Sequence, residues 1–413
     1  MHTPSATAVA GGRLAVFTAL SSPNYRLFWT GQISAVMGQT MEFVALAWLV
    51  LQLTNSALSI GLAGLAQAAP RIALVFIGGA VADRMDRRLL LVLTNCFSAA
   101  LYFLLATLVV LERIDIWQVF GFAFLLGCVR AFDGPSRQAL LPHVVGRDQI
   151  ANAVALGNFA WEAPRLVGPA LAGVLISIAG VGQTFYVAGF GNLLSAVLFR
   201  LIRIEGPGVR RVERSLLDSM LAGIDVIRRS PLFQALIGLT FFNSVFGLSY
   251  VFLVPIFARD ILQVGSQGYG FLHTAGGAGA LVGSLFAATM AQSQHRGRHI
   301  IVGAASFGLL LVVFAASPWF VLSLAVIFCA AIANNVYMTA IATALQLRLA
   351  DEYRARVMGI YGLTWSLMPL GGTLAGSVAE LAGAPIALGL GGLLVASMAL
   401  LVAVFVSSIR DLE

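Results

Sequence analysis

Three observations predict an all-α polytopic membrane protein, with twelve transmembrane helices in two pseudo-symmetric six-helix bundles. The composition is too apolar for a soluble core, the apolar residues fall in twelve long runs, and the two halves of the chain repeat each other. Of the 413 residues, 59% are hydrophobic and only 10% are charged, whereas about 25% are charged in a soluble domain. Lipid is the solvent in which so much apolar surface is stable.

The twelve apolar runs each meet or approach the length of about 20 residues that a helix needs to cross a bilayer. They lie near residues 27–53, 57–82, 88–111, 115–133, 149–180, 182–202, 232–258, 267–292, 299–316, 318–347, 355–382 and 385–408. The first 26 residues are polar to mixed and contain no signal-peptide pattern. We therefore expect the first run to stay in the membrane.

The basic residues predict the orientation of the chain. All 25 are Arg. If the N-terminus is cytoplasmic, 20 of them fall on the inner side, Arg113 and Arg259 fall on the outer side, and Arg71, Arg130 and Arg165 lie inside helices. Because cytoplasmic loops carry the excess of positive charge in membrane proteins, we expect both termini in the cytoplasm. This distribution explains the basic charge without nucleic acid, and we expect the inner (plasma) membrane of a bacterium.

The longest polar stretch separates six runs from six. It predicts an N-terminal bundle over residues 1–202, a cytoplasmic linker over 203–231 and a C-terminal bundle over 232–413. Apolar residues recur at helical spacing in the linker, at Leu216, Leu217, Met220, Leu221, Ile224 and Ile227. The stretch is either an amphipathic helix on the inner membrane surface or a plain connection.

The two halves show weak internal similarity. A shift of 209 residues lays Ile60-Gly61-Leu62 on Tyr269-Gly270-Phe271 and Arg87 on Arg296. Further along, a shift of 203 lays Asp148 on Asp351, Gly168 on Gly371 and Gly173 on Gly376. Such similarity is expected when two six-helix repeats face each other across a central site.

Residues 79–88, Gly-Ala-Val-Ala-Asp-Arg-Met-Asp-Arg-Arg, lie between the second and third runs. They resemble the signature loop of the major facilitator superfamily, Gly-x-x-x-Asp-Arg-x-Gly-Arg-Arg, with Asp86 in place of the second Gly. The resemblance implies that Asp83 helps to latch the two halves on the inner side. Its candidate partner is a helix N-terminus in residues 351–359, whose dipole would attract the negative charge of Asp83. The other residues of the implied latch are Arg84, Arg87, Arg88, Arg354 and Arg356. A simple topology anchor would explain these arginines but does not require Asp83.

Two further motifs resemble the same superfamily. Residues 126–134 resemble its fourth-helix pattern, which implies that Arg130 faces the cavity and takes part in proton transfer, with Asp133 in the position of a Gln. Residues 165–173 resemble a Gly-Pro motif of antiporters, at Gly168, Pro169 and Gly173. These small residues also permit close helix packing, which is the alternative explanation. With residues 133–142, the resemblance narrows to the branch that contains the enterobactin exporter and macrolide efflux pumps.

Five charged residues fall inside the predicted spans of the N-terminal half. A charge at mid-bilayer costs at least about 2.5–3.5 kcal/mol, so each is expected to face a cavity or a partner. Glu42 is the candidate proton site, acting with Arg130, unless the two form a static ion pair. Glu162 and Arg165, spaced i, i+3, either neutralise each other or line the cavity. Arg71 either pairs with Glu42 or holds an anionic substrate.

The predicted spans of the C-terminal half carry mainly neutral polar residues, which suggests that this half adapts to the substrate. The predicted proton-coupling residues are Glu42, Arg130 and Asp133. The predicted substrate cavity contains Met41, Arg71, Glu162, Arg165, Asn243, Asn335 and Trp365. Flexible and aromatic contacts of this kind suit large, greasy ligands.

The resemblance implies a secondary active transporter that exports amphipathic small molecules, such as drugs or siderophores, by proton antiport through alternating access. The alternative is an uncoupled or differently coupled transporter of a lipid-like or anionic substrate. We do not expect an enzyme, because the sequence has no nucleotide-binding loop or nucleophile motif. No cofactor and no metal are expected, since Cys96, Cys128 and Cys329 lack ligand spacing. The expected partners are the small-molecule substrate, protons and the lipid bilayer, and the expected oligomeric state is a monomer.

Overall fold

The computed structural model describes residues 15–203, 216–290, 295–410 and 412. The described part is almost entirely helical and contains no strand. The helices are η1 (Ala15–Ser21), α1 (Pro23–Thr54), α2 (Ala57–Arg84), α3 (Arg87–Val110), α4 (Ile116–Val144), η2 (Arg147–Gln149), α5 (Ile150–Ala179), α6 (Val181–Leu201), α7 (Leu216–Arg229), α8 (Pro231–Phe242), η3 (Asn243–Gly247), α9 (Tyr250–Ile256), η4 (Phe257–Ile261), α10 (Gly265–Thr289), α11 (Arg296–Ala315), α12 (Phe320–Arg348), α13 (Asp351–Trp365), α14 (Met368–Ala382), α15 (Ala384–Phe405) and α16 (Ser407–Arg410).

Short polar residues set the starts of several helices. Ser22 and Ser56 accept a backbone hydrogen bond in the first turn of α1 and α2, respectively. Asp86, which replaces a Gly of the superfamily pattern, caps α3 by accepting from the backbone N–H groups of Arg88 and Leu89. Each cap satisfies a donor that the helix itself leaves unpaired. The substitution at Asp86 therefore fits a tight turn between α2 and α3.

Among the described residues, eleven helical segments are long and apolar enough to cross a membrane. One of them, Pro231–Ile261, combines α8, η3, α9 and η4 and contains two π-helical turns. The predicted span 355–382 forms α13 and α14, which are interrupted at Ser366 and Leu367, so neither reaches spanning length alone. Together these two helices cover the remaining predicted span, and the predicted fold class is confirmed.

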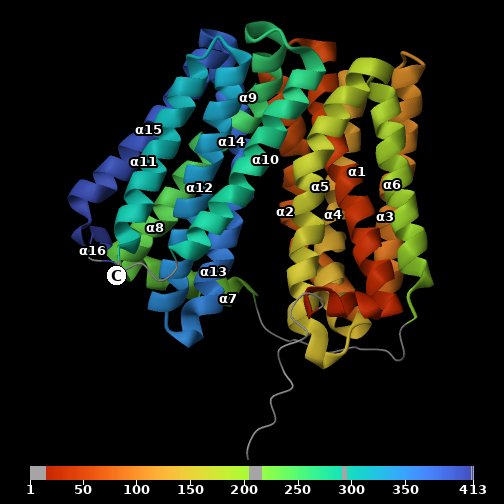
Figure 1. The fold of residues 1–413 in the computed structure, drawn as a ribbon, viewed down its shortest axis with the longest axis horizontal. Helices are drawn as coiled ribbons and strands as arrows, with labels where there is room; N and C mark the ends of the chain where they lie inside the picture. Colours follow the sequence, from red (N-terminus) through yellow and green to blue (C-terminus); the bar gives the residue numbers. More distant parts are fainter. Residues whose placement is uncertain (1–14, 204–215, 291–294, 411, 413) are drawn as a thin grey trace, which may run out of the picture.

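The helices form two bundles that meet at one end and diverge at the other (Figure 1). Helices α1–α6 make one bundle and α8–α15 the other. We call the end where α7 and the C-terminus lie the linker end, and the opposite one the far end. Helix α7 packs on α13 at the linker end, so the apolar spacing in the linker does form a helix. Of its predicted apolar face, Ile224 and Ile227 are half-buried, and the other four side chains lie outside the described part.

The two bundles contact each other mainly where α2 crosses α14 and where α5 crosses α10. At the second crossing, a Cβ added to Gly173 would lie 2.5 Å from the Ser266 carbonyl oxygen, and one added to Gly270 would lie 2.4 Å from that of Pro169. Only glycine permits backbones to approach so closely.

The crossing of α2 and α14 repeats this arrangement. A Cβ on Gly61 or Gly376 would lie 2.6 Å from a backbone carbonyl oxygen of the opposite helix. The sequence repeat pairs Gly61 with Gly270 and Gly173 with Gly376. The repeated glycines are therefore the residues that join the two bundles, once at each of two related crossings.

Candidate functional site

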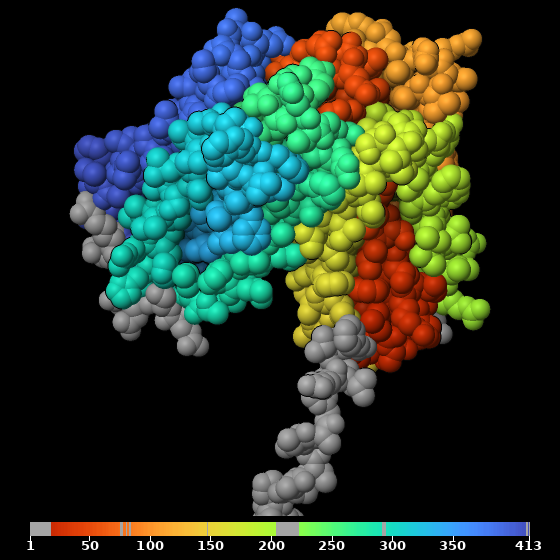
Figure 2. Space-filling view, turned by 45° about the horizontal axis from the view of Figure 1, so that its top comes forward, coloured from red at the N-terminus to blue at the C-terminus, as the bar shows by residue number. Residues whose placement is uncertain are grey.

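A cavity of about 420 Å³ lies between the two bundles. Helices α1, α2 and α4 line one side, and α9, α13 and α14 line the other. Its polar and aromatic lining includes Phe43, Gln67, Arg71, Arg130, Phe252 and Trp365. The surface is hollowed between the two bundles toward the linker end (Figure 2).

Glu42 lies behind the cavity wall and is fully buried. Its Oε2 atom accepts from Nη2 of Arg130 at 2.6 Å, and its Oε1 accepts from Nε2 of Gln67 at 3.1 Å. Arg130 also donates to Oε1 of Gln67 at 3.1 Å and to the hydroxyl of Tyr102 at 3.0 Å. Four helices of the N-terminal bundle thus contribute to one connected hydrogen-bond network around a buried ion pair. Two members of this network, Arg130 and Gln67, line the cavity.

Gln67 and Tyr102 were missed in the sequence, because neutral polar residues are common in membrane spans and carry no charge to mark them. Their role follows from packing. A Cβ on Gly127 would lie 2.1 Å from the Gln67 carbonyl oxygen. Helices α2 and α4 therefore run very close together one turn before Arg130, and this closeness allows Arg130 to reach Gln67.

Arg71 differs from Arg130 because no side chain in the described part of the chain is paired with it. Its side chain is exposed and lines the cavity, and no ion pair or hydrogen bond to it is found among the described residues. Both carboxylate oxygens of Glu42 are engaged by Arg130 and Gln67 instead. Of the two interpretations of Arg71, the pairing with Glu42 is not present in this conformation.

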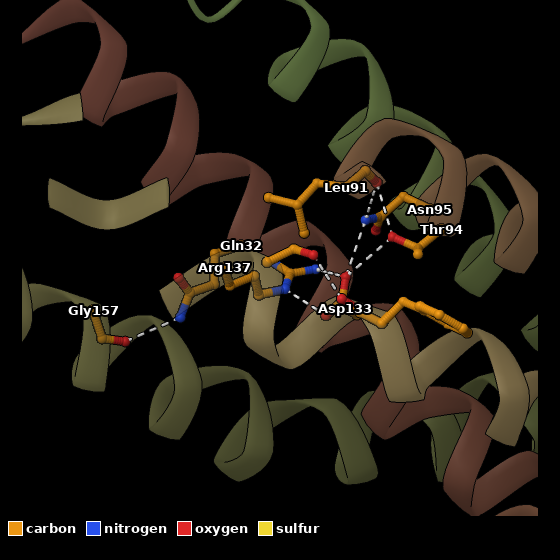
Figure 3. Close-up of polar contacts among 9 residues, drawn as sticks. Gln32, Leu91, Thr94, Asn95, Asp133, Arg137 and Gly157 are labelled. Atoms are coloured by element: carbon orange, nitrogen blue, oxygen red, sulfur yellow. Dashed lines mark hydrogen bonds and ion pairs between the residues drawn. The ribbon is translucent and has the colours of Figure 1, made fainter. Parts of the chain in front are cut away.

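Asp133 belongs to a second buried cluster, which lies about one turn after Arg130 along α4 (Figure 3). Its carboxylate binds the guanidinium of Arg137 at 2.5 and 3.0 Å and accepts from Thr94 and Asn95 at 3.4 Å. Arg137, which the sequence analysis places on the inner side, is 4% exposed and stacks over Phe199. Helix α4 extends eleven residues beyond the predicted end of this span at 133, which is why Arg137 is inside the bundle.

The predicted cavity residues are not all in one place. Arg71 and Trp365 line the cavity, whereas Met41 and Asn243 are buried elsewhere in the bundles. Asn243 accepts from Asn334 at 2.7 Å, and Asn335 accepts from Ser284 at 3.1 Å. Glu162 and Arg165 form an exposed ion pair with 3.6 Å between Oε1 and Nη1, as their spacing suggested.

The residues of the implied latch bond within their own bundles. Arg87 donates to the Ala139 carbonyl, and Arg88 donates to that of Ile202. Arg354 forms an ion pair with Asp351 at 2.6 Å, and Arg356 stacks on Tyr353. Arg84 is exposed, and the Asp83 side chain lies outside the described part of the chain. No bond from these described side chains reaches the opposite bundle.

At the far end, by contrast, polar contacts join the two bundles. Arg259 donates to the Leu51 carbonyl at 3.2 Å and to Oδ1 of Asn55 at 2.7 Å. The Ser56 hydroxyl donates to the Glu380 carboxylate. The far end is therefore closed while the linker end is open.

His273 is a further residue that the sequence analysis did not single out. It lies on α10 against Phe43 and Tyr269, with ring centroids 5.6 and 4.9 Å away. Its Nε2 atom and the Tyr269 hydroxyl are buried without a hydrogen-bond partner among the described residues. A histidine inside a predicted span was the only available signal. In the described residues, no group of three His, Cys, Asp or Glu side chains could hold a metal ion.

The sequence matches a family model described as transmembrane secretion effector over residues 14–413. It is 28% identical to the multidrug efflux pump Tap of Mycolicibacterium fortuitum, over 92% of this chain and 95% of that protein. It is 23% identical to macrolide efflux protein A of Streptococcus pyogenes, over 93% and 96%. The staphyloferrin A transporter of Staphylococcus aureus matches at 24% over 63% of this chain and 66% of that protein.

Two solved structures show the same fold. A bacterial homologue of the human lysosomal transporter Spinster, in an inward-facing and occupied conformation, superposes with a TM-score of 0.71 at 14% identity, covering 97% of this chain and 99% of that one. The nucleoside transporter NupG superposes with a TM-score of 0.73 at 11% identity, covering 94% and 99%.

Proposed function

The chain belongs to the transmembrane secretion effector family of major facilitator transporters, and from this we propose that it exports amphipathic small molecules, such as drugs or siderophores, by proton antiport. It is a membrane transporter and not an enzyme, as its family is. The observation that carries the proposal is the buried Glu42–Arg130 pair at the wall of the central cavity.

Glu42 is the proposed proton carrier. In this conformation Arg130 compensates its charge at 2.6 Å. Protonation of Glu42 would remove the charge that holds Arg130 against it, so that Arg130 could extend into the cavity and take up the space that a cargo needs. A cargo that fills the cavity would keep Arg130 on Glu42, and the paired carboxylate would then stay ionised. Proton binding at Glu42 and cargo binding in the cavity therefore disfavour each other, which is the requirement for antiport.

In alternating access, this site would be exposed first to one side of the membrane and then to the other. The far end is closed and the linker end is open, and the glycine crossings of α2 with α14 and α5 with α10 are the natural points about which the bundles rock. Closing the linker end would bring residues 83–88 toward the N-terminus of α13, where the latch would engage. The Arg distribution supports a cytoplasmic linker end in the inner membrane, and we propose that the unit is a monomer.

The test uses purified protein in liposomes that contain a pH-sensitive dye. A pH gradient is imposed, and lipophilic drugs and catecholate siderophores are added in turn. We expect substrate-dependent proton flux in the wild type and its loss in Glu42→Gln, because the Gln oxygen can still accept from Arg130 but the amide cannot carry the proton. Glu162→Gln is the matched control and should keep the flux, since its carboxylate is exposed and lies outside the cavity lining. Unchanged coupling in Glu42→Gln would rule out the proposed proton site.

Arg71 favours a second candidate function, uncoupled transport of a lipid-like or anionic substrate. A cation that has no ion-pair partner among the described residues and lines a cavity is suited to binding an anion. In this case labelled substrate would cross the membrane without a pH gradient and without proton flux. Glu42→Gln would then alter stability but not transport.

A further inference from the structure

A second hollow adjoins the central cavity. It is a groove of about 580 Å³ that lies between Ile72 of α2 on one side and helices α7, α8 and α13 on the other. Its lining is apolar at Ile227, Ile237, Phe241, Ile360 and Leu363. Ile72 and Ser366 line both the groove and the central cavity, so the two spaces share a wall.

Two of the three polar side chains along the groove, Gln234 and Thr364, are already engaged in internal hydrogen bonds, and the third is Ser366. Gln234 donates from Nε2 to the Arg228 carbonyl at 2.6 Å, and the Thr364 hydroxyl donates to the Tyr361 carbonyl at 2.7 Å. The groove therefore offers van der Waals contact and little else. An alkyl chain is the kind of group that such a surface accepts.

The cavity next to the groove, in contrast to the apolar groove, contains charged side chains. Arg71 precedes Ile72 directly in the sequence and lines the cavity, while Ile72 lines both spaces. The charge of Arg130, the other cation of the cavity lining, is compensated by Glu42 at 2.6 Å. Arg71 is thus the cation that has no ion-pair partner among the described lining residues, and it stands beside the mouth of an apolar groove.

We propose that the groove and the cavity form one bipartite site for a single-chain anionic amphiphile, whose head binds Arg71 and whose alkyl tail lies in the groove. Because α2 and α8 belong to different bundles, the groove exists only while the linker end is open. The substrate would reach the cavity sideways from the bilayer between these helices. The inference rests on the proposed transport function and names its substrate class.

The test is a binding measurement, which needs neither a pH gradient nor transport. Radiolabelled N-lauroylglycine is titrated onto the full chain in nanodiscs of neutral phosphatidylcholine. Unlabelled competitors are lauroylcholine, which has the same tail and a cationic head, and N-acetylglycine, which has the same head and no tail. We expect saturable binding that N-lauroylglycine displaces and that the other two displace poorly.

The variants separate the head from the tail. Arg71→Gln should weaken binding about tenfold to hundredfold, the range for losing a hydrogen bond to a charged group, and Arg71→Lys should retain most of it. Arg71→Glu should reverse the preference toward lauroylcholine, a gain that a misfolded protein cannot show. Ile237→Trp should block the tail, whereas Leu309→Trp, on the exposed surface of α11, should not. Phe241→Trp replaces Ile237→Trp if the latter does not purify.

Several outcomes would overturn the proposal. Equal affinity for the anionic and cationic heads would show that Arg71 does not select the charge. Full competition by N-acetylglycine would exclude the groove. Absence of saturable binding would mean that bulk lipid alone fills the groove, and displacement by phosphatidylglycerol at equal mole fraction would assign it to a resident lipid. Saturable binding of N-lauroylglycine to the wild type without substrate-dependent proton flux would reject the proposed antiport and leave this inference standing, so the two failures are distinguishable.

Discussion

Glu42 and Arg130 are held together by geometry that only an arginine provides. The guanidinium reaches the carboxylate of Glu42, the amide of Gln67 and the hydroxyl of Tyr102 with two of its nitrogen atoms. A lysine ammonium is a point charge without this planar fork and could not keep the same three bonds in place. The network is therefore fixed in the bundle even though one of its members borders the cavity.

Removing one charge of this pair should lower the free energy of unfolding more than removing both charges. Arg130→Met leaves Glu42 buried without its cation, so we expect a loss of about 3–5 kcal/mol in the free energy of unfolding. The double variant Glu42→Gln/Arg130→Met should recover most of that loss, because no buried charge remains. Denaturant unfolding in detergent, followed by tryptophan fluorescence, measures both values. A double variant as unstable as Arg130→Met would show that shape, not charge, holds the network.

At the residue scale, a charge inside a predicted span was the signal that the sequence offered. Glu42 and Arg130 could be singled out because a charge inside a span needs a reason. Gln67 and Tyr102 could not, because the sequence does not show which neutral residues of α2 and α3 face α4. The i, i+4 spacing of Asp133 and Arg137 was visible, but the span was expected to end at 133, so the pair was divided between a helix and a loop.

At the scale of helices, one proline explains a break, whereas other prolines lie inside continuous helices. Pro369 cannot donate to the carbonyl of Trp365, and its ring would clash there in a continuous helix. The chain accordingly ends α13 at Trp365 and restarts at Met368. Pro70, Pro135 and Pro164 nevertheless lie inside uninterrupted helices. Sequence alone could not separate these cases, because neighbouring helices decide whether the freed carbonyl finds another partner.

The crossing of α2 and α14 should be sensitive to one added side chain. In Gly61→Val, the new Cβ would lie 2.6 Å from backbone atoms of Gly372 and Thr373, so the far end must open. Spin labels at Gln52 and Gln263, both exposed at the far end in different bundles, should therefore show a longer distance by pulsed electron resonance. Gly121→Val is the control, since its Cβ would meet nothing within 4 Å. An unchanged distance in Gly61→Val would mean that the crossing does not hold the far end closed.

For the whole molecule, the structure defines one of two expected conformations. The bundles are joined at the far end by the glycine crossings and by the contacts of Arg259 and Glu380. The described latch residues at the linker end bond only within their own bundles. The overall fold was predictable because length, apolar runs and the internal repeat act on the whole chain. The relative tilt of the bundles was not, because length, apolar runs and the internal repeat are the same whichever end is open.

Fixing the far end should stop transport without unfolding the protein. Ser56→Cys and Glu380→Cys, in a background without the three native cysteines, place two thiols where side chains of the two bundles meet. A short bifunctional methanethiosulfonate reagent should link them, abolish export and leave the melting temperature unchanged or higher. Dithiothreitol should restore export. Full export by the linked protein would show that the far end need not open during the cycle.

The placement of Glu42 and Arg130 in the same bundle has an electrical consequence. Rocking the bundles carries the pair as a unit, so equal and opposite charges move together and no net work is done against the membrane voltage. An elementary charge that crossed the full field would gain or lose about 2.3 kcal/mol per 100 mV. The voltage dependence of the cycle is then set by the proton, by the cargo and by Arg71. Currents recorded with neutral, anionic and cationic cargo would each report a different net charge per turnover.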